Sequence, residues 1–331
     1  MSFAKLVPII AAGFAFGQSA RVLTRESETP FILKLGGMAP PRPLWSGRAL
    51  LSTEIPESRE LVFEASTSDG RSEEIRFSDP DWGLLRVASL WGGEDGRIVL
   101  AGTGQTEPGV NSSFIGWISA DRSERKIVKV EDYTIQVMTI GPGGVIWALG
   151  RKPAHAPERP GLNVLLRFSP DGKLLAATYV KARGVGTFVD GVPVGSADVS
   201  GGSSLRASAD RVAWLTAKDE YIEFDSSGTD ITRLNGPQPA ETRDLWDQAL
   251  SISAANTALI SMPHSRRSGK TTLDVWMLDR VANEWVKSEP AEGSFPPGTR
   301  IYGFNDSDLM TSGHSPQTGS LLVRYRLSES R

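Results

Sequence analysis

Short apolar runs alternate with turn-forming residues along most of this chain. The clearest example is Val164 to Tyr179, in which two apolar runs flank Ser169-Pro170-Asp171-Gly172. Proline fixes φ at the first turn position, aspartate can bond to the backbone ahead of it, and glycine accepts positive φ. This stretch therefore predicts a β-hairpin, and repeated short runs of this kind are typical of all-β proteins.

A turn residue followed by a short apolar strand recurs six times. These anchors are Gly47, Gly96, Gly144, Asp210, Asn256 and Ser307. Four of the five intervals between them are close to fifty residues, a length that accommodates the four strands of a β-propeller blade. The longer interval contains an insertion rich in glycine, serine and valine, residues 181–204.

The repeat predicts a single all-β domain, a β-propeller of six four-stranded blades. Five or seven blades remain alternatives, because the inner strand of the first unit would fall in the poor strand former Met38 to Pro43. The last unit is one strand short after Leu321 to Leu327. We expect the N-terminal run Phe31 to Leu35 to supply that strand and close the ring, since closure removes exposed strand edges.

The period and the turn Phe168-Ser169-Pro170-Asp171-Gly172-Lys173 resemble those of six-bladed β-propellers of the NHL-repeat, TolB-like and gluconolactonase-like groups. The resemblance spans roughly Pro30 to Leu327. None of the functional motifs of these groups is matched residue by residue. The resemblance therefore implies a fold and no activity.

The N-terminus has the layout of a signal peptide. Lys5 precedes the apolar run Leu6 to Phe16, and small residues follow up to Ala20. The run is shorter than the ~20 residues that span a bilayer. We therefore expect residues 1–20 to be a signal peptide, residues 21–331 to form the propeller, and the mature protein to be exported to the periplasm or the extracellular space without a membrane span.

Composition narrows the range of partners. The chain has 331 residues with 36 basic and 39 acidic side chains and a net charge of -3, so it lacks the global positive field of a nucleic-acid-binding protein. It contains no cysteine, which excludes disulfides and thiolate metal sites. We expect a monomer whose partner is another protein or a small polar or anionic ligand.

The long loops of the predicted propeller share one face, where second strands connect to third strands. They are Gly102 to Ser112, Gly150 to Leu162, Met262 to Thr271 and Gly313 to Gly319, joined there by the insertion. Their basic and imidazole side chains could bind an anionic or polar ligand at the channel mouth. The alternative is that they are scattered, solvated loop residues. The candidate ligand-binding residues are Arg151, His155, Arg159, His264, Arg266, Arg267, Lys270 and His314.

No catalytic signature is present in the sequence. Ser268-Gly269-Lys270-Thr271 ends like a phosphate-binding loop, but His264 occupies the position of its first glycine. Gly313-His314-Ser315 lacks the second glycine of a nucleophile elbow, because Gln317 stands there. We therefore predict a non-enzymatic binding protein without a cofactor or metal. The alternative is a metal-dependent hydrolase or lactonase, which requires the histidines to converge at the channel mouth.

Overall fold

Antiparallel strands make up nearly all of the regular structure in the computed structural model. The only described helical segment is a single 3-10 turn, Pro142–Gly144. The structure describes residues 21–30, 44–53, 57–151, 163–180, 188–189, 192–193, 205–216, 220–237, 244–253, 256–264, 272–288, 299–305, 307–315, 317 and 319–329.

Six four-stranded units account for all but three short strands of the described part of the chain, and each unit is a blade. From the centre outwards, blade 1 contains β2 (Leu44–Ser46), β3 (Ala49–Thr53), β5 (Leu61–Thr67) and β6 (Ser72–Phe77). Blade 2 contains β7 (Leu84–Gly92), β8 (Ile98–Glu107), β9 (Val110–Ile118) and β10 (Arg125–Val130), with the short β4 (Glu57–Ser58) added beside β7. Blade 3 contains β11 (Thr134–Ile140), β12 (Ile146–Arg151), β13 (Asn163–Phe168) and β14 (Leu174–Val180).

The second half of the chain repeats the same plan. Blade 4 contains β17 (Leu205–Ala207), β18 (Arg211–Leu215), β19 (Glu220–Asp225) and β20 (Asp230–Asn235). Blade 5 contains β21 (Asp244–Ile252), β22 (Thr257–His264), β23 (Asp274–Asp279) and β24 (Glu284–Ser288). Blade 6 contains β25 (Ile301–Asn305), β26 (Asp308–Ser315), β27 (Gly319–Glu329) and β1 (Arg21–Pro30). A two-stranded pair, β15 (Phe188–Val189) and β16 (Val192–Pro193), lies in the insertion.

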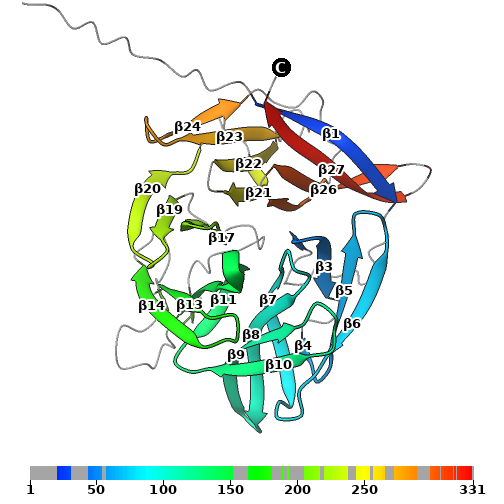
Figure 1. Ribbon diagram of the computed structural model, residues 1–331, viewed down its shortest axis with the longest axis vertical. Helices are drawn as coiled ribbons and strands as arrows, with labels where there is room; N and C mark the ends of the chain where they lie inside the picture. The colour runs from blue at the N-terminus through cyan, green and yellow to red at the C-terminus, as the bar shows by residue number, and fades with distance from the viewer. Residues whose placement is uncertain are drawn as a thin grey trace, which may run out of the picture.

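The blades form a closed ring (Figure 1). The innermost strands contact one another in the cyclic order β2, β7, β11, β17, β21, β25 and back to β2. Each predicted anchor residue lies just before the second strand of a blade, as Gly96 does before β8 and Asn256 before β22. The six-bladed propeller predicted from the repeat is therefore confirmed.

The closing strand differs from the predicted one. The fourth strand of blade 6 is β1, which pairs antiparallel with β27, whereas the predicted segment Phe31 to Leu35 lies outside the described residues. An outermost strand needs few apolar side chains, because only one side of it packs on the sheet. In β1, Leu23 supplies that contact and is 3% exposed. Searching for an apolar run therefore missed the charged stretch that closes the ring.

Two of the predicted loops are shorter than expected. The segment Gly102 to Ser112 is mostly paired strand, since β8 and β9 stay paired, with one shift of register after Gln105, out to Glu107 and Val110. Only the turn at Pro108 and Gly109 separates them, and the polar residues of this exposed hairpin tip need no apolar alternation. In blade 6, β26 likewise continues to Ser315 and pairs there with Gly319.

The core lies in the seams between adjacent blades. Six clusters of buried apolar residues are found in the described part of the chain, and each draws mainly on two neighbouring blades. In the first seam, for example, Phe63 of blade 1 packs with Leu85 and Phe114 of blade 2. Sheet-on-sheet burial therefore holds the ring together and leaves the channel axis free for polar groups.

The hairpin turn that is clearest in the sequence belongs to one of these seams. Ser169 and Lys173 close the turn through an N–H to carbonyl bond of 2.9 Å, and Gly172 adopts φ +85°. A side chain at Gly172 would meet the Trp117 ring of blade 2 at 2.8 Å. Glycine is therefore required both by the turn and by the close approach of blades 2 and 3.

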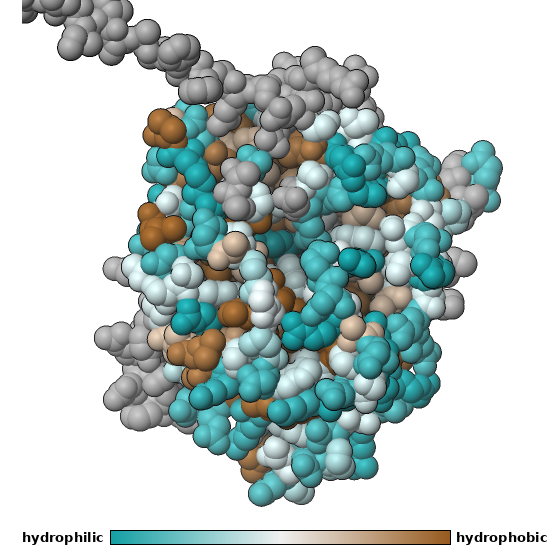
Figure 2. Space-filling view, in the orientation of Figure 1, coloured by the Kyte–Doolittle hydropathy of each residue, from teal (hydrophilic) through white to brown (hydrophobic). Residues whose placement is uncertain are grey.

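The exposed surface is largely polar on the face seen in Figure 2. Apolar groups appear there as separate spots, several along the edge where Figure 1 places the outer strands β14, β20 and β24. These strands carry the exposed residues Leu174, Leu175, Ile231 and Val286. A search of the described residues finds no helix with the length and apolar character needed to cross a bilayer.

Candidate functional site

A cavity of about 600 Å³ opens at the central channel. All six blades contribute to its lining, mainly through the ends of their first strands and through first-to-second-strand turns. It therefore lies on the face opposite the predicted long loops. Most of the lining comes from three turns or strand ends, residues 91–97, 139–144 and 304–305.

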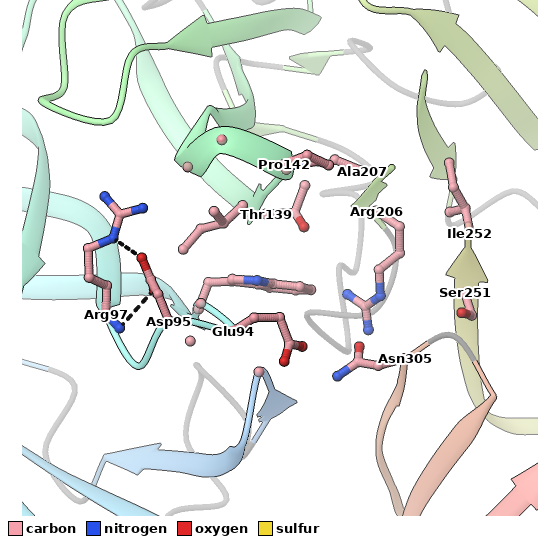
Figure 3. A pocket seen from close by; sticks show the side chains of 18 of the residues that line it. Glu94, Asp95, Arg97, Thr139, Pro142, Arg206, Ala207, Ser251, Ile252 and Asn305 are labelled. Carbon is pink, nitrogen blue, oxygen red and sulfur yellow. Dashed lines mark hydrogen bonds and ion pairs between the residues drawn. The ribbon is translucent and has the colours of Figure 1, made fainter. Parts of the chain in front are cut away.

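The turn of blade 2 is held by an internal ion pair. The Asp95 carboxylate accepts bonds from the Arg97 backbone N–H at 3.1 Å and from its Nε at 2.7 Å (Figure 3). Partial burial opposes ionisation of Asp95, but these bonds prevail and lower its pKa. A side chain at Gly144 would meet the Arg97 guanidinium at 2.2 Å, so this glycine leaves the space that the arginine occupies. Asp95 and Arg97 thus form a neutral part of the wall.

A buried arginine forms another part of the wall. Arg206 lies on the innermost strand of blade 4 and is 4% exposed. Its Cζ stands 4.5 Å from the centroid of the Trp91 ring of blade 2, an approach that suits a cation–π contact and fixes the guanidinium in place. Its Nη1 also donates to the Leu205 carbonyl at 3.3 Å. Burial lowers the pKa of Arg206 to about 9, which still leaves it positively charged near neutral pH.

Two polar side chains face the arginine across the cavity. Figure 3 shows the Glu94 carboxylate, the Asn305 amide and the Arg206 guanidinium pointing into the same space. They come from blades 2, 6 and 4, so alternate blades around the ring each supply one group. Glu94 is exposed and forms no hydrogen bond or ion pair with any described residue.

A buried hydroxyl adds to the polar character of the wall. Thr139, at the end of the first strand of blade 3, is 1% exposed, and its Oγ1 has no hydrogen-bond partner among the described residues. Figure 3 shows this hydroxyl on the side of the cavity. Buried polar atoms are usually hydrogen-bonded, and those that are not often mark a site that a ligand or water completes.

The residues predicted from the sequence lie elsewhere. Arg151 ends β12 and is buried, which lowers its pKa. His264 ends β22, and His314 lies near the end of β26 with an exposed side chain. These three positions are at second-strand ends, on the face where the long loops were predicted. The remaining candidates, which are His155, Arg159, Arg266, Arg267 and Lys270, lie outside the described residues.

The hypothesis of a loop-face site therefore stays a prediction. Within the described ranges, no three histidine, aspartate or glutamate side chains are grouped closely enough to hold a metal ion. His155 is not among the residues described, so the metal-dependent alternative is not tested by this observation.

The cavity residues lie on inner strands and in short turns, whereas all the residues predicted from the sequence came from the long loops. One signal was available: Arg206 is a charged residue on an otherwise apolar inner strand, immediately after the insertion. A second was Gly92-Gly93-Glu94-Asp95-Gly96, a turn with more acidic groups than the turn itself requires. Neither signal shows that the two segments meet.

Comparisons with known proteins do not assign this chain to a family. No protein-family model and no curated protein sequence matches the chain. Among solved structures, the Dos1 propeller is similar at 9% identity and a TM-score of 0.42, over 86% of this chain and 65% of that one. The structure of BBS1N in complex with ARL6DN is similar at 14% identity and a TM-score of 0.41, over 83% of this chain and 74% of that one.

The chain thus spans slightly less than two thirds of the length of the Dos1 propeller chain. The assignment of six blades rests on the strand order within each sheet and on the closed ring of inner strands. The sequence and its structure place this chain among six-bladed β-propellers.

Proposed function

We propose that this propeller is a binding protein whose central cavity, on the face of the first-to-second-strand turns, holds a small molecule with an anionic group. The observation that carries the proposal is Arg206, a guanidinium buried in the cavity wall and oriented by the Trp91 ring. Burying a charge is costly, and the lowered pKa reflects that cost. The guanidinium points into the cavity, and a bound anion would add an attraction that favours its charge (Figure 3).

The cavity has the dimensions of a small-molecule site. Its volume of about 600 Å³ falls within the ~300–1,000 Å³ typical of ligand pockets. We favour binding over catalysis as the function of the cavity, because the described lining residues include no nucleophile placed beside a base and an orienting group.

Calorimetric titration of the full chain with a panel of small carboxylates, with and without amino groups, tests the proposal. We expect at least one member to bind the wild type and to lose tenfold or more in affinity for Arg206→Met. Arg125→Met is the matched control, since it removes the same charge from an exposed position on the outer strand β10 and should bind normally. If no carboxylate binds the wild type, or if both variants bind equally, the proposal is wrong.

Export is a further part of the proposed function, supported by Lys5, the apolar run Leu6 to Phe16 and the small residues after it. Expression with the complete N-terminus, followed by cell fractionation and N-terminal sequencing, tests it. A processed protein beginning near residue 21 outside the cytoplasm is expected. An unprocessed chain that stays in the cytoplasm would contradict it.

A further inference from the structure

The ionic side chains of the described cavity lining are balanced in charge. Arg97 is paired with Asp95 at 2.7 Å, and the other ionic groups of the described lining are one guanidinium, Arg206, and one carboxylate, Glu94. A site for a simple anion would be expected to carry a positive excess. This lining has none.

The position of Glu94 matters as much as its charge. Its carboxylate points into the space that Arg206 and Asn305 also face (Figure 3). An anion bound by Arg206 would therefore lie near a second negative charge, which disfavours it. A ligand that also carries a positive group on its Glu94 side removes this repulsion and gains an attraction.

Hydrogen bonds within the turn engage Asp95 and leave the Glu94 carboxylate exposed. Asp95, the neighbouring acid, is used inside the turn by Arg97, whereas Glu94 is exposed and forms no bond with a described residue. Of the two acidic residues in this turn, Asp95 thus stabilises the turn and Glu94 faces the cavity. Asn305, whose amide can donate to a carboxylate or accept from an ammonium, faces the same space.

We propose that the ligand is a zwitterion of the amino-acid class, with its carboxylate at Arg206, its ammonium group at Glu94 and Asn305 beside them. The inference rests on the proposed function, because it names the ligand class of the same cavity. The three groups come from blades 4, 2 and 6, so the ligand lies across the channel axis and contacts alternate blades.

A titration series separates this inference from the broader proposal. The probes are glycine, β-alanine, 4-aminobutanoate and 6-aminohexanoate, which differ only in the distance between their charges, with propionate as the anion alone and propylamine as the cation alone. We expect one amino acid to bind at least tenfold more tightly than propionate, and the best chain length to report the distance between the two binding groups.

A variant of Glu94 tests whether this residue binds the ammonium group of the ligand. In Glu94→Gln, which keeps the size of the side chain and removes its charge, the advantage of the amino acid over propionate should disappear. Glu284→Gln is the matched control, since Glu284 is an exposed carboxylate on the outer strand β24, and it should leave the advantage intact.

The outcomes distinguish the two claims. If propionate binds as tightly as every amino acid, or if Glu94→Gln keeps the full advantage, the zwitterion inference is wrong while the anion site stands. If neither the amino acids nor propionate bind, the zwitterion inference and the proposed function are both wrong.

Discussion

Two arginines of the propeller lie in opposite electrostatic surroundings. At the seam between blades 4 and 5, Arg280 donates to Glu223 at 2.7 Å and to the Thr257 hydroxyl at 2.7 Å, and its pKa is raised by the bond to Glu223. In the central cavity, burial lowers the pKa of Arg206 to about 9. The fold favours the charge of the first arginine and opposes the charge of the second.

The carboxylate at the seam completes this contrast. Glu223 is fully buried, and its own burial opposes ionisation, but bonds from Arg280 and the Tyr221 hydroxyl lower its pKa overall. Arg211 approaches the same carboxylate at 3.8 Å. This network is satisfied from several sides and serves the fold. Burial of a charge is therefore informative only when its surroundings are known, and Arg206, whose charge is disfavoured by burial, is the better candidate for a binding residue.

The largest expected effect comes from breaking the seam network. Glu223→Gln should lower the free energy of unfolding by about 3–5 kcal/mol, because it leaves Arg280 and Arg211 without their shared carboxylate. Urea unfolding followed by tryptophan fluorescence measures it. Glu284→Gln, which changes an exposed carboxylate on the neighbouring blade 5, is the control and should change stability by less than ~0.5 kcal/mol. If Glu223→Gln is as stable as Glu284→Gln, the seam network does not stabilise the fold, and its contrast with the cavity is lost.

A second seam offers a purely steric test. Gly172→Ala should destabilise the protein by about 2–3 kcal/mol, since the new Cβ would combine positive φ with a 2.8 Å approach to Trp117. Gly109→Ala shares the positive φ, +81°, but has nothing within 4 Å, and should cost about 1 kcal/mol. Thermal unfolding of the pair isolates the inter-blade contact. If both variants lose the same free energy of unfolding, the positive φ alone accounts for the loss and the contact with Trp117 adds nothing.

The pH dependence of binding should sharpen the description of the cavity. Because the pKa of Arg206 lies at about 9, anion binding should be constant below that value and fall about tenfold per pH unit well above it. A trimethylammonium analogue of the best amino acid is the appropriate probe, since its own charges do not titrate in this range. Binding that stays constant to pH 11 would contradict the assignment of Arg206 as the anion-binding group.

The smallest effect concerns an exposed hairpin turn of blade 2. Bonds from Ser119 and Ser123 lower the pKa of Asp121 to about 2. Because its pKa is lowered in the folded state, its contribution to stability is complete above the ordinary aspartate pKa and is lost as the pH falls towards 2. Carboxyl-detected NMR titration measures this value. In Ser119→Ala the pKa of Asp121 should rise, and an unchanged value would show that the hydroxyl is not the cause.

The blades could be predicted from the sequence because each second strand is apolar and follows a turn residue. Gly96 before β8 and Asn256 before β22 show that this local signal survives without sequence identity between repeats. The closing strand could not be found in the same way. Among the side chains of β1 that the structure describes, Leu23 alone is a buried apolar residue, and the pairing of β1 with β27 joins opposite ends of the chain.

The cavity was harder to predict for a different reason. Glu94, Arg206 and Asn305 are roughly a hundred residues apart in sequence, and each is unremarkable in its own segment. Only closure of the ring brings alternate blades to a common axis (Figure 3). Local patterns specify strands and turns, whereas this site depends on the number of blades and on the phase of the turns.

The stability of Arg206→Met without ligand shows whether Arg206 serves binding or the fold. Methionine is apolar and fills a similar space, and it removes the charge that burial disfavours, so the variant should be at least as stable as the wild type, with an unchanged slope in urea unfolding. The same substitution at Arg280 should be destabilising. An Arg206→Met variant that is instead less stable by 1 kcal/mol or more would show that Arg206 is retained for the fold and would contradict its role in binding.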